Sequence, residues 1–245
     1  MIKKRTAWII GISSFLIPVI IFVLLFNFVM SQVTMMGTSQ RLTKTNNYTS
    51  LTDIAPHEAT VFFGDSITEL CPTEEIYADY MKTSGISVIN RGISAETTTT
   101  MVERFDDNVI GLKPRNLVLL MGVNDLSEGT SLEQIVKNIQ TMIQMTKTKS
   151  PQTHIILQAV YPINKTERKE YYEKFQIGDR DNETINQLNK KLEKLASDEQ
   201  ITFLNVNEYL MNEQGDLRND YTSDGLHPNI AGYMAIRDQI IKELK

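Results

Sequence analysis

Two short motifs, far apart in the chain, supply the side chains needed for nucleophilic acyl transfer. One is Gly-Asp-Ser-Ile at residues 64–67, and the other is Asp-Gly-Leu-His-Pro-Asn at residues 224–229. Ser66 could attack a carbonyl carbon, and His227 could accept the proton of its hydroxyl group. Asp224 could hold the imidazole in the required tautomer. Because it precedes the histidine by only three residues, one tight loop can present both side chains.

Two segments between these motifs offer hydrogen-bond donors for an oxyanion. Gly92 lies in Asn-Arg-Gly and Asn124 in Gly-Val-Asn-Asp, each after another apolar run. A glycine N–H can approach a substrate closely, an asparagine amide can donate, and the Ser66 N–H would lie at a helix N-terminus. Taken singly, these residues could be a turn glycine, a turn asparagine and a capping serine. Their joint occurrence favours one catalytic site.

The four segments, in this order, resemble the sequence blocks of the SGNH hydrolases, also called GDSL-type esterases and lipases. The resemblance covers roughly residues 58–244. The four positions for which that family is named carry no substitution here: Ser66, Gly92, Asn124 and His227. Asp224 matches the third member of the family's triad. The resemblance implies a serine esterase that forms an acyl-enzyme, with oxyanion donors at Ser66, Gly92 and Asn124, and with no metal or cofactor.

Beyond residue 58, apolar runs alternate with helix-like segments, which predicts a doubly wound α/β domain with a five-stranded parallel sheet. Five runs rich in Val, Ile, Leu and Phe are the strand candidates: 60–63, 87–90, 117–121, 154–159 and 202–206. Five segments are the helix candidates: about 73–83, 97–110, 131–147, 181–197 and 229–243. Thr130 or Ser131 is expected to cap the third helix. In the fourth, an apolar stripe recurs at helical spacing: Ile185, Leu188, Leu192 and Leu195.

This topology would gather the candidate residues at one edge. Ligands of parallel sheets bind outside the carboxyl ends of the strands. Ser66, Gly92 and Asn124 each follow a predicted strand by a few residues. His227 precedes the last helix, and its loop could fold back over that edge. The family resemblance implies the same three-layer α/β/α, flavodoxin-like arrangement.

The N-terminal part predicts a membrane anchor. Residues 7–30 carry no charge and are mostly apolar, which is long enough to cross a bilayer. Basic residues at positions 3–5 precede this segment, so residues 1–6 are predicted to be cytoplasmic and the rest extracytoplasmic. An uncleaved signal anchor is favoured over a cleaved signal peptide, whose apolar region would span only about 7–15 residues. The polar segment 31–56 is interpreted as a linker, which leaves 57–245 as the catalytic domain.

Charge and composition argue against nucleic acid as a partner and indicate structural roles for the cysteine and two of the histidines. The net charge is −5 although three basic residues lie at the N-terminus, so the remainder is acidic and argues against nucleic acid. Cys71 is the single cysteine and is expected to be a packing residue. His57 and His154 are expected to be structural. The Lys-, Asn- and Ile-rich composition suits a bacterial surface protein, and no oligomeric state is predicted.

The substrate stays open at this stage. Short acyl groups on an extracellular glycan are favoured, because the domain is predicted to lie outside the membrane behind a polar linker. A lysophospholipase or lipase, or an O-acyltransferase that uses a sugar hydroxyl as acceptor, would need the same triad. The stretch 162–180 is interpreted as a lid or substrate-contacting loop, or equally as a solvated excursion.

Two alternatives belong to other classes. One is a non-catalytic surface binding module. The other is a metal-dependent phosphoesterase whose ligands would be Asp65, Asn124, Asp224 and His227, although three histidines in the whole chain argue against it. Asp65 and Asp125 are instead expected to be structural and to bind loop N–H groups.

Overall fold

The chain forms two packing units. The computed structural model describes residues 2–165 and 177–245, and the side chains from residue 16 onward. One unit runs up to Lys44, and the other comprises Thr45–Lys245 and contains the sheet.

The sheet is parallel throughout and confirms the predicted topology. Its order is β2-β1-β3-β4-β5, so the chain starts in the interior, crosses to one edge and returns to build the other side. The strands are β1 (Thr60–Gly64), β2 (Val88–Asn90), β3 (Asn116–Leu120), β4 (His154–Gln158) and β5 (Thr202–Leu204). β1 and β3 are buried along their whole length, as their continuous apolar runs predict.

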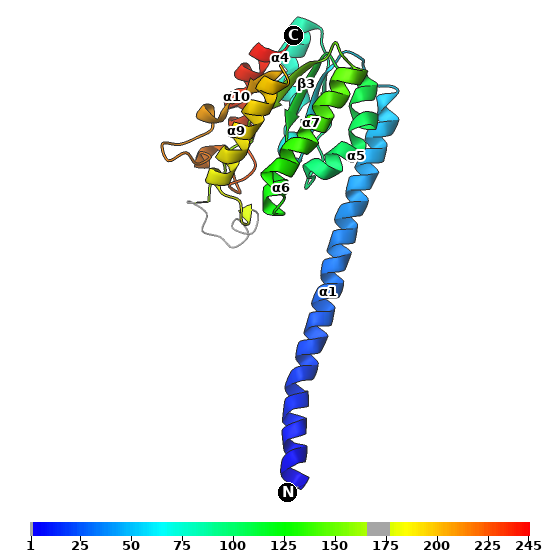
Figure 1. Ribbon diagram of the computed structural model, residues 1–245, viewed down its shortest axis with the longest axis vertical. Helices are drawn as coiled ribbons and strands as arrows, with labels where there is room; N and C mark the ends of the chain where they lie inside the picture. Colours follow the sequence, from blue (N-terminus) through cyan, green and yellow to red (C-terminus); the bar gives the residue numbers. More distant parts are fainter. Residues whose placement is uncertain (1, 166–176) are drawn as a thin grey trace. The chain divides into compact units, whose positions relative to one another are not determined.

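Neighbouring phenylalanines of β1 identify the two helical layers. Side chains of successive strand residues point to opposite faces. Phe63 makes an edge contact with Phe105 of α5, whereas Phe62 packs against Tyr77, at the junction of α3 and α4. α5, α7 and α9 therefore cover one face, and α3, α4 and α10 the other (Figure 1).

The predicted helices are present, with local differences at their ends. Tyr77 divides the segment expected at 73–83 into two short helices, and the one expected at 97–110 ends at Asn108. Ser131 caps α7 by accepting the Gln134 N–H, and the apolar stripe of α9 is buried. The helices of this unit are α2 (Ser66–Glu69), α3 (Thr73–Ile76), α4 (Ala78–Ser84), α5 (Thr98–Asn108), α6 (Val123–Ser127), α7 (Leu132–Lys149), α9 (Asn182–Asp198), α10 (Ile230–Glu243), and the 3-10 turns Ile110–Leu112, Asn207–Tyr209 and Asn219–Tyr221.

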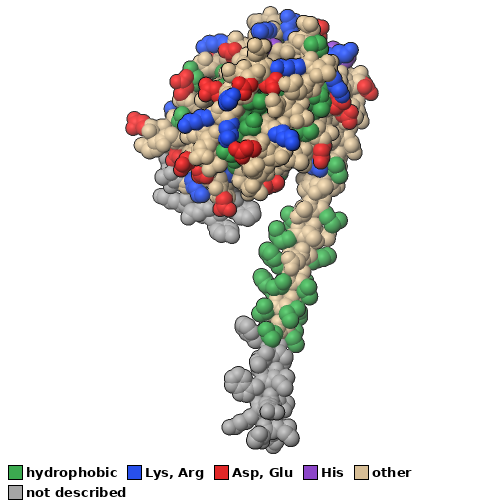
Figure 2. Space-filling view, in the orientation of Figure 1, with side chains coloured by type: hydrophobic (Ala, Val, Ile, Leu, Met, Phe, Trp, Pro, Cys, Tyr) green, Lys and Arg blue, Asp and Glu red, His purple; other side chains and the backbone are tan. Residues whose placement is uncertain are grey.

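The N-terminal helix α1 spans Ile2–Thr52, so the polar segment expected as a linker is helical as far as Thr52. From Leu16 onward it is long and apolar enough to cross a membrane, by length and composition alone. Figure 2 shows its exposed apolar side chains. Its last turns belong to the sheet-containing unit, which begins at Thr45 and not at residue 57. There Asn108 of α5 donates to Thr49 Oγ1 (2.9 Å), so polar residues that suggest a linker act as packing contacts.

A buried ion pair ties α5 to the strand ends. Arg104 Nε donates to Glu96 Oε2 at 2.7 Å, and the two side chains are 1% and 0% exposed. The same guanidinium donates to Arg91 O (3.0 Å) and stacks on the Phe63 ring. The loop after β2 is thereby fixed against α5 and β1.

Arg104→Met should lower the free energy of unfolding by about 3–5 kcal/mol, because the Glu96 carboxylate would stay buried without that cation. Denaturant unfolding followed by circular dichroism measures the change. The control is Lys149→Met, which breaks the exposed pair with Asp106 and should lower it by no more than about 1 kcal/mol. Equal losses in the two variants would contradict the expectation.

Candidate active site

Ser66, His227 and Asp224 form one chain of hydrogen bonds. Ser66 is the first residue of α2, directly after β1, and Asp65 caps this helix by accepting the Ile67 N–H (2.9 Å). Ser66 Oγ lies 2.8 Å from His227 Nε2, and His227 Nδ1 lies 2.6 Å from Asp224 Oδ2. The structure thus brings Ser66 into contact with His227, which lies 161 residues later in the chain.

The loop that carries Asp224 and His227 is built around the Asp224 carboxylate. Oδ1 accepts the N–H groups of Leu226 and His227, each at 2.9 Å, while Oδ2 faces the imidazole. Burial alone would raise the pKa of Asp224, but the hydrogen bonds from the His227 side chain and the two N–H groups outweigh it and hold this pKa well below its usual range. An ionised Asp224 favours the tautomer with the proton on Nδ1, which leaves Nε2 free to accept the serine proton.

Tyr233 aligns this loop with the nucleophile. Its hydroxyl, on α10, donates to Ile67 O of α2 at 2.7 Å and is buried. Asn229 caps α10 by accepting the Gly232 N–H. The last helix, which begins just after His227, is therefore fixed to the helix that begins with Ser66. Sequence reasoning missed Tyr233, which lies on a helix without a distinctive motif.

Asn124 is held on both sides of its amide. It lies in α6, shortly after β3. Nδ2 donates to Glu96 O at 3.0 Å, and Oδ1 accepts from Arg180 Nη2 at 2.8 Å. One N–H of the amide remains for another acceptor. The Ser66 N–H, at the first position of α2, has no acceptor within the described parts of the chain.

Gly92 differs from its expected role. Its N–H donates to Asn90 Oδ1 at 2.8 Å and is not available to an oxyanion in this structure. Asn90 is itself held, because its amide donates to Thr68 O and Cys71 O. A Cβ at Gly92 would lie 2.3 Å from Glu69 N, so close packing against α2 requires the glycine.

Ala95 offers a more exposed donor on the same loop. It has a left-handed backbone with φ +62°, and it is exposed. Its N–H has no acceptor among the residues that the structure describes. Since L-residues adopt this conformation at a cost, the loop is held in a strained shape near the triad. The sequence carries no signal for it beyond its place three residues after Gly92.

Asp65 and Asp125 bind backbone N–H groups, but these belong to the first turns of α2 and α5 and not to the predicted loops. Asp125 is fully buried and accepts the Thr98 N–H (2.9 Å) and hydroxyl (2.5 Å). Burial raises the pKa of Asp65 to about 7 and also raises that of Asp125. Over the described ranges, no cluster of three or more His, Cys, Asp or Glu is arranged to hold a metal ion.

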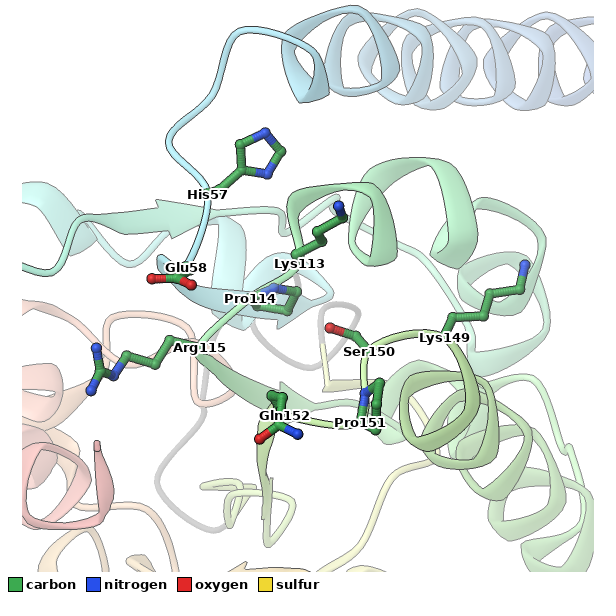
Figure 3. Close-up of a pocket in the computed structure, with 9 residues that line it drawn as sticks. All are labelled: His57, Glu58, Lys113, Pro114, Arg115, Lys149, Ser150, Pro151 and Gln152. Atoms are coloured by element: carbon green, nitrogen blue, oxygen red, sulfur yellow. The ribbon is translucent and has the colours of Figure 1, made fainter.

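The remaining candidates lie elsewhere. A cavity of about 800 Å³ is lined by residues that precede β1, β3 and β4 (Figure 3). It therefore lies at the amino-terminal ends of these strands, whereas Ser66 lies beyond the carboxyl end of β1. His57 lines the cavity, and His154 opens β4, so both lie away from the triad. Cys71 is partly buried against the core, as expected. The segment interpreted as a lid falls largely on residues 166–176, outside the described residues.

The chain is similar to known ester hydrolases. A match to the family described as GDSL-like Lipase/Acylhydrolase covers residues 62–235. The isoamyl acetate-hydrolyzing esterase of Saccharomyces cerevisiae is 25% identical over 212 residues, which are 77% of this chain and 87% of that protein. Platelet-activating factor acetylhydrolase IB subunit alpha2 of Rattus norvegicus is 28% identical over 178 residues, 72% of this chain and 71% of that one. A solved structure from Streptococcus pneumonia, provisionally described as a platelet activating factor, superposes with a TM-score of 0.81 at 28% identity and covers 89% of this chain and 99% of that one.

Asp65→Asn should remove a pH dependence of stability. Since burial raises the pKa of Asp65 from 3.8 to about 7, the folded state binds this proton more tightly than the unfolded state. The contribution to stability is complete below the unfolded value and is lost as pH rises towards about 7. The free energy of unfolding of the wild type, minus that of the variant, should therefore fall with rising pH. Urea denaturation across this window measures it, and a difference that rises with pH would contradict the assignment.

Proposed function

The chain belongs to the GDSL-like lipase/acylhydrolase family, and from this premise we propose that it hydrolyses carboxylic esters with Ser66 as the nucleophile. The observation that carries the proposal is the continuous chain from Ser66 Oγ through His227 to Asp224, with distances of 2.8 and 2.6 Å. This geometry lets His227 take the hydroxyl proton while Asp224 stabilises the imidazolium.

The reaction proceeds in two steps. Ser66 Oγ bonds to the carbonyl carbon as His227 Nε2 takes its proton, and the bond to the leaving oxygen breaks as Nε2 returns that proton to the departing alcohol. Water then attacks the acyl-serine. It gives one proton to Nε2, and the serine oxygen recovers that proton when the carboxylic acid leaves. Asp224 stays ionised throughout.

The oxyanion is bound by N–H donors from α2, from α6 and from the loop after β2. The Ser66 N–H and the second Asn124 amide N–H face no acceptor within the part of the chain that the structure describes. We assign the third donor to the Ala95 N–H instead of the Gly92 N–H, because the latter is already bonded to Asn90. Removal of one such donor costs on the order of 2.7–4 kcal/mol of transition-state stabilisation.

The substrate is proposed to be an ester of a short acyl group outside the membrane. Two relatives support the short chain by name, since one hydrolyses isoamyl acetate and the other is an acetylhydrolase. The apolar helix from Leu16 supports a membrane anchor with its N-terminus in the cytoplasm, because basic residues precede it. An extracellular glycan ester fits this location. A lysophospholipid substrate, or transfer to a sugar hydroxyl, would use the same triad.

Ser66→Ala should abolish ester hydrolysis, with kcat reduced by about 10⁴- to 10⁶-fold, because the nucleophile is lost. The assay uses p-nitrophenyl esters from acetate to long acyl chains and the full chain in mild detergent. The control is Ser127→Ala, an exposed serine at the end of α6, which should keep full activity. A rate that falls with chain length supports the short acyl group. Undiminished hydrolysis by Ser66→Ala would rule out the proposed nucleophile.

Asp224→Asn should lower kcat by about 10⁴-fold, because the amide favours the wrong imidazole tautomer. The matched control is Asp220→Asn, on an exposed residue of the same loop region that pairs with Arg218. Its kcat should equal that of the wild type. The assignment of the orienting carboxylate fails if the two variants behave alike on p-nitrophenyl acetate.

A further inference from the structure

Arg180 contacts the oxyanion region without reaching the triad. It is buried and precedes Asp181, the residue that caps α9. Within the described residues, its guanidinium donates from Nε to Val123 O (2.8 Å), from Nη1 to Ile177 O (2.9 Å) and from Nη2 to Asn124 Oδ1 (2.8 Å). The planar group is therefore fixed in position and orientation.

These bonds decide which way the Asn124 amide points. An asparagine amide can be turned over, which exchanges its oxygen and nitrogen. Here the oxygen faces the Arg180 cation and the nitrogen faces Glu96 O. The reversed amide would place N–H groups against a guanidinium and a carbonyl oxygen against another carbonyl oxygen. Only the observed orientation directs the remaining Nδ2–H outward as a donor.

The cation also strengthens that donor. A charged hydrogen bond to the amide oxygen is stronger than a neutral one and draws electron density from the amide nitrogen. The effect is large where water is excluded, and Arg180 is only 8% exposed. Its positive charge also lies on the side of the site where negative charge would develop on the substrate oxygen.

We propose that Arg180 is a positioning residue of the reaction, which fixes and polarises the Asn124 amide as an oxyanion donor. The inference rests on the proposed ester hydrolysis. A role in folding alone would be met by the bonds to Val123 O and Ile177 O, whereas the third bond ends on the side chain that faces the oxyanion. Sequence reasoning did not single out Arg180. It is the last residue of the stretch 162–180, for which the sequence left open a lid, a substrate-contacting loop or a solvated excursion.

A double-mutant cycle of Arg180→Met and Asn124→Ala tests the inference on p-nitrophenyl acetate with the full chain. Asn124→Ala should lower kcat by about 10²- to 10³-fold. Arg180→Met should lower kcat by about 10- to 100-fold, with KM nearly unchanged, because a misplaced donor is felt in the transition state. In the double variant the arginine change should have little further effect, since it acts through an amide that is absent. The inference would be overturned if the kcat loss of the double variant equalled the product of the losses of the two single variants.

Further variants separate this role from folding and from the proposed function. Arg237→Met removes a partly buried arginine from α10 and should keep wild-type kcat, which controls for loss of such a side chain. If Arg180→Met does not fold, Arg180→Lys and Arg180→Gln replace it. Lysine should keep more activity than glutamine because it keeps the charge, and wild-type kcat in both would overturn the inference. If hydrolysis survives Ser66→Ala, the proposed function is refuted. If hydrolysis depends on Ser66 but the kcat losses of Arg180→Met and Asn124→Ala multiply in the double variant, only the role of Arg180 is refuted.

Discussion

The end of the sheet that carries the site depends on the buried guanidinium groups of Arg104 and Arg180, which keep their charge and donate to acceptors on the surrounding loops. Arg104 finds them in the Glu96 carboxylate and Arg91 O. Arg180 finds them in two carbonyl oxygens and the Asn124 amide oxygen. Because Asn124 also donates to Glu96 O, the loops after β2 and β3 form one network between the two cations. Their relative position follows from the requirement that neither cation be buried without acceptors.

Asp224 and His227 are aligned by contacts within one loop, whereas Ser66 is aligned with them by contacts between distant parts of the chain. Asp224 and His227 share one loop, so their geometry is set within a few residues by N–H groups that bind a single carboxylate. Ser66 reaches them only through the tertiary fold. The bond from Tyr233 to Ile67 O connects α10 to α2 and so carries the alignment across the sheet edge. Loss of the Tyr233 hydroxyl would therefore act on the distance between serine and histidine, although it touches neither side chain.

The strands, and the approach of Ser66 to His227 and Asp224, could be predicted from the sequence. Buried parallel strands appear as apolar runs, and the carboxyl ends of these strands lie on one side of the sheet. The role of Gly92 could not be predicted, because its N–H is bonded to Asn90, whose amide is held by Thr68 O of α2 and by Cys71 O just beyond that helix. The sequence also does not reveal that the packing unit begins at Thr45. Polar residues such as Thr49 suggest a linker, yet they serve as partners of α5. Arg180 lacks any local motif, and only its tertiary contacts reveal its place.

Most polar groups around Ser66 are paired within the fold before any substrate arrives. Asp65 and Asp125 are buried against N–H groups, and the raised pKa of Asp65 reflects how unfavourable it is to bury its charge. Among the donors that the described residues leave open are the N–H groups of Ser66 and Ala95 and one amide N–H of Asn124. An oxyanion would complete these, and donors already fixed in place need no reorientation as its charge develops.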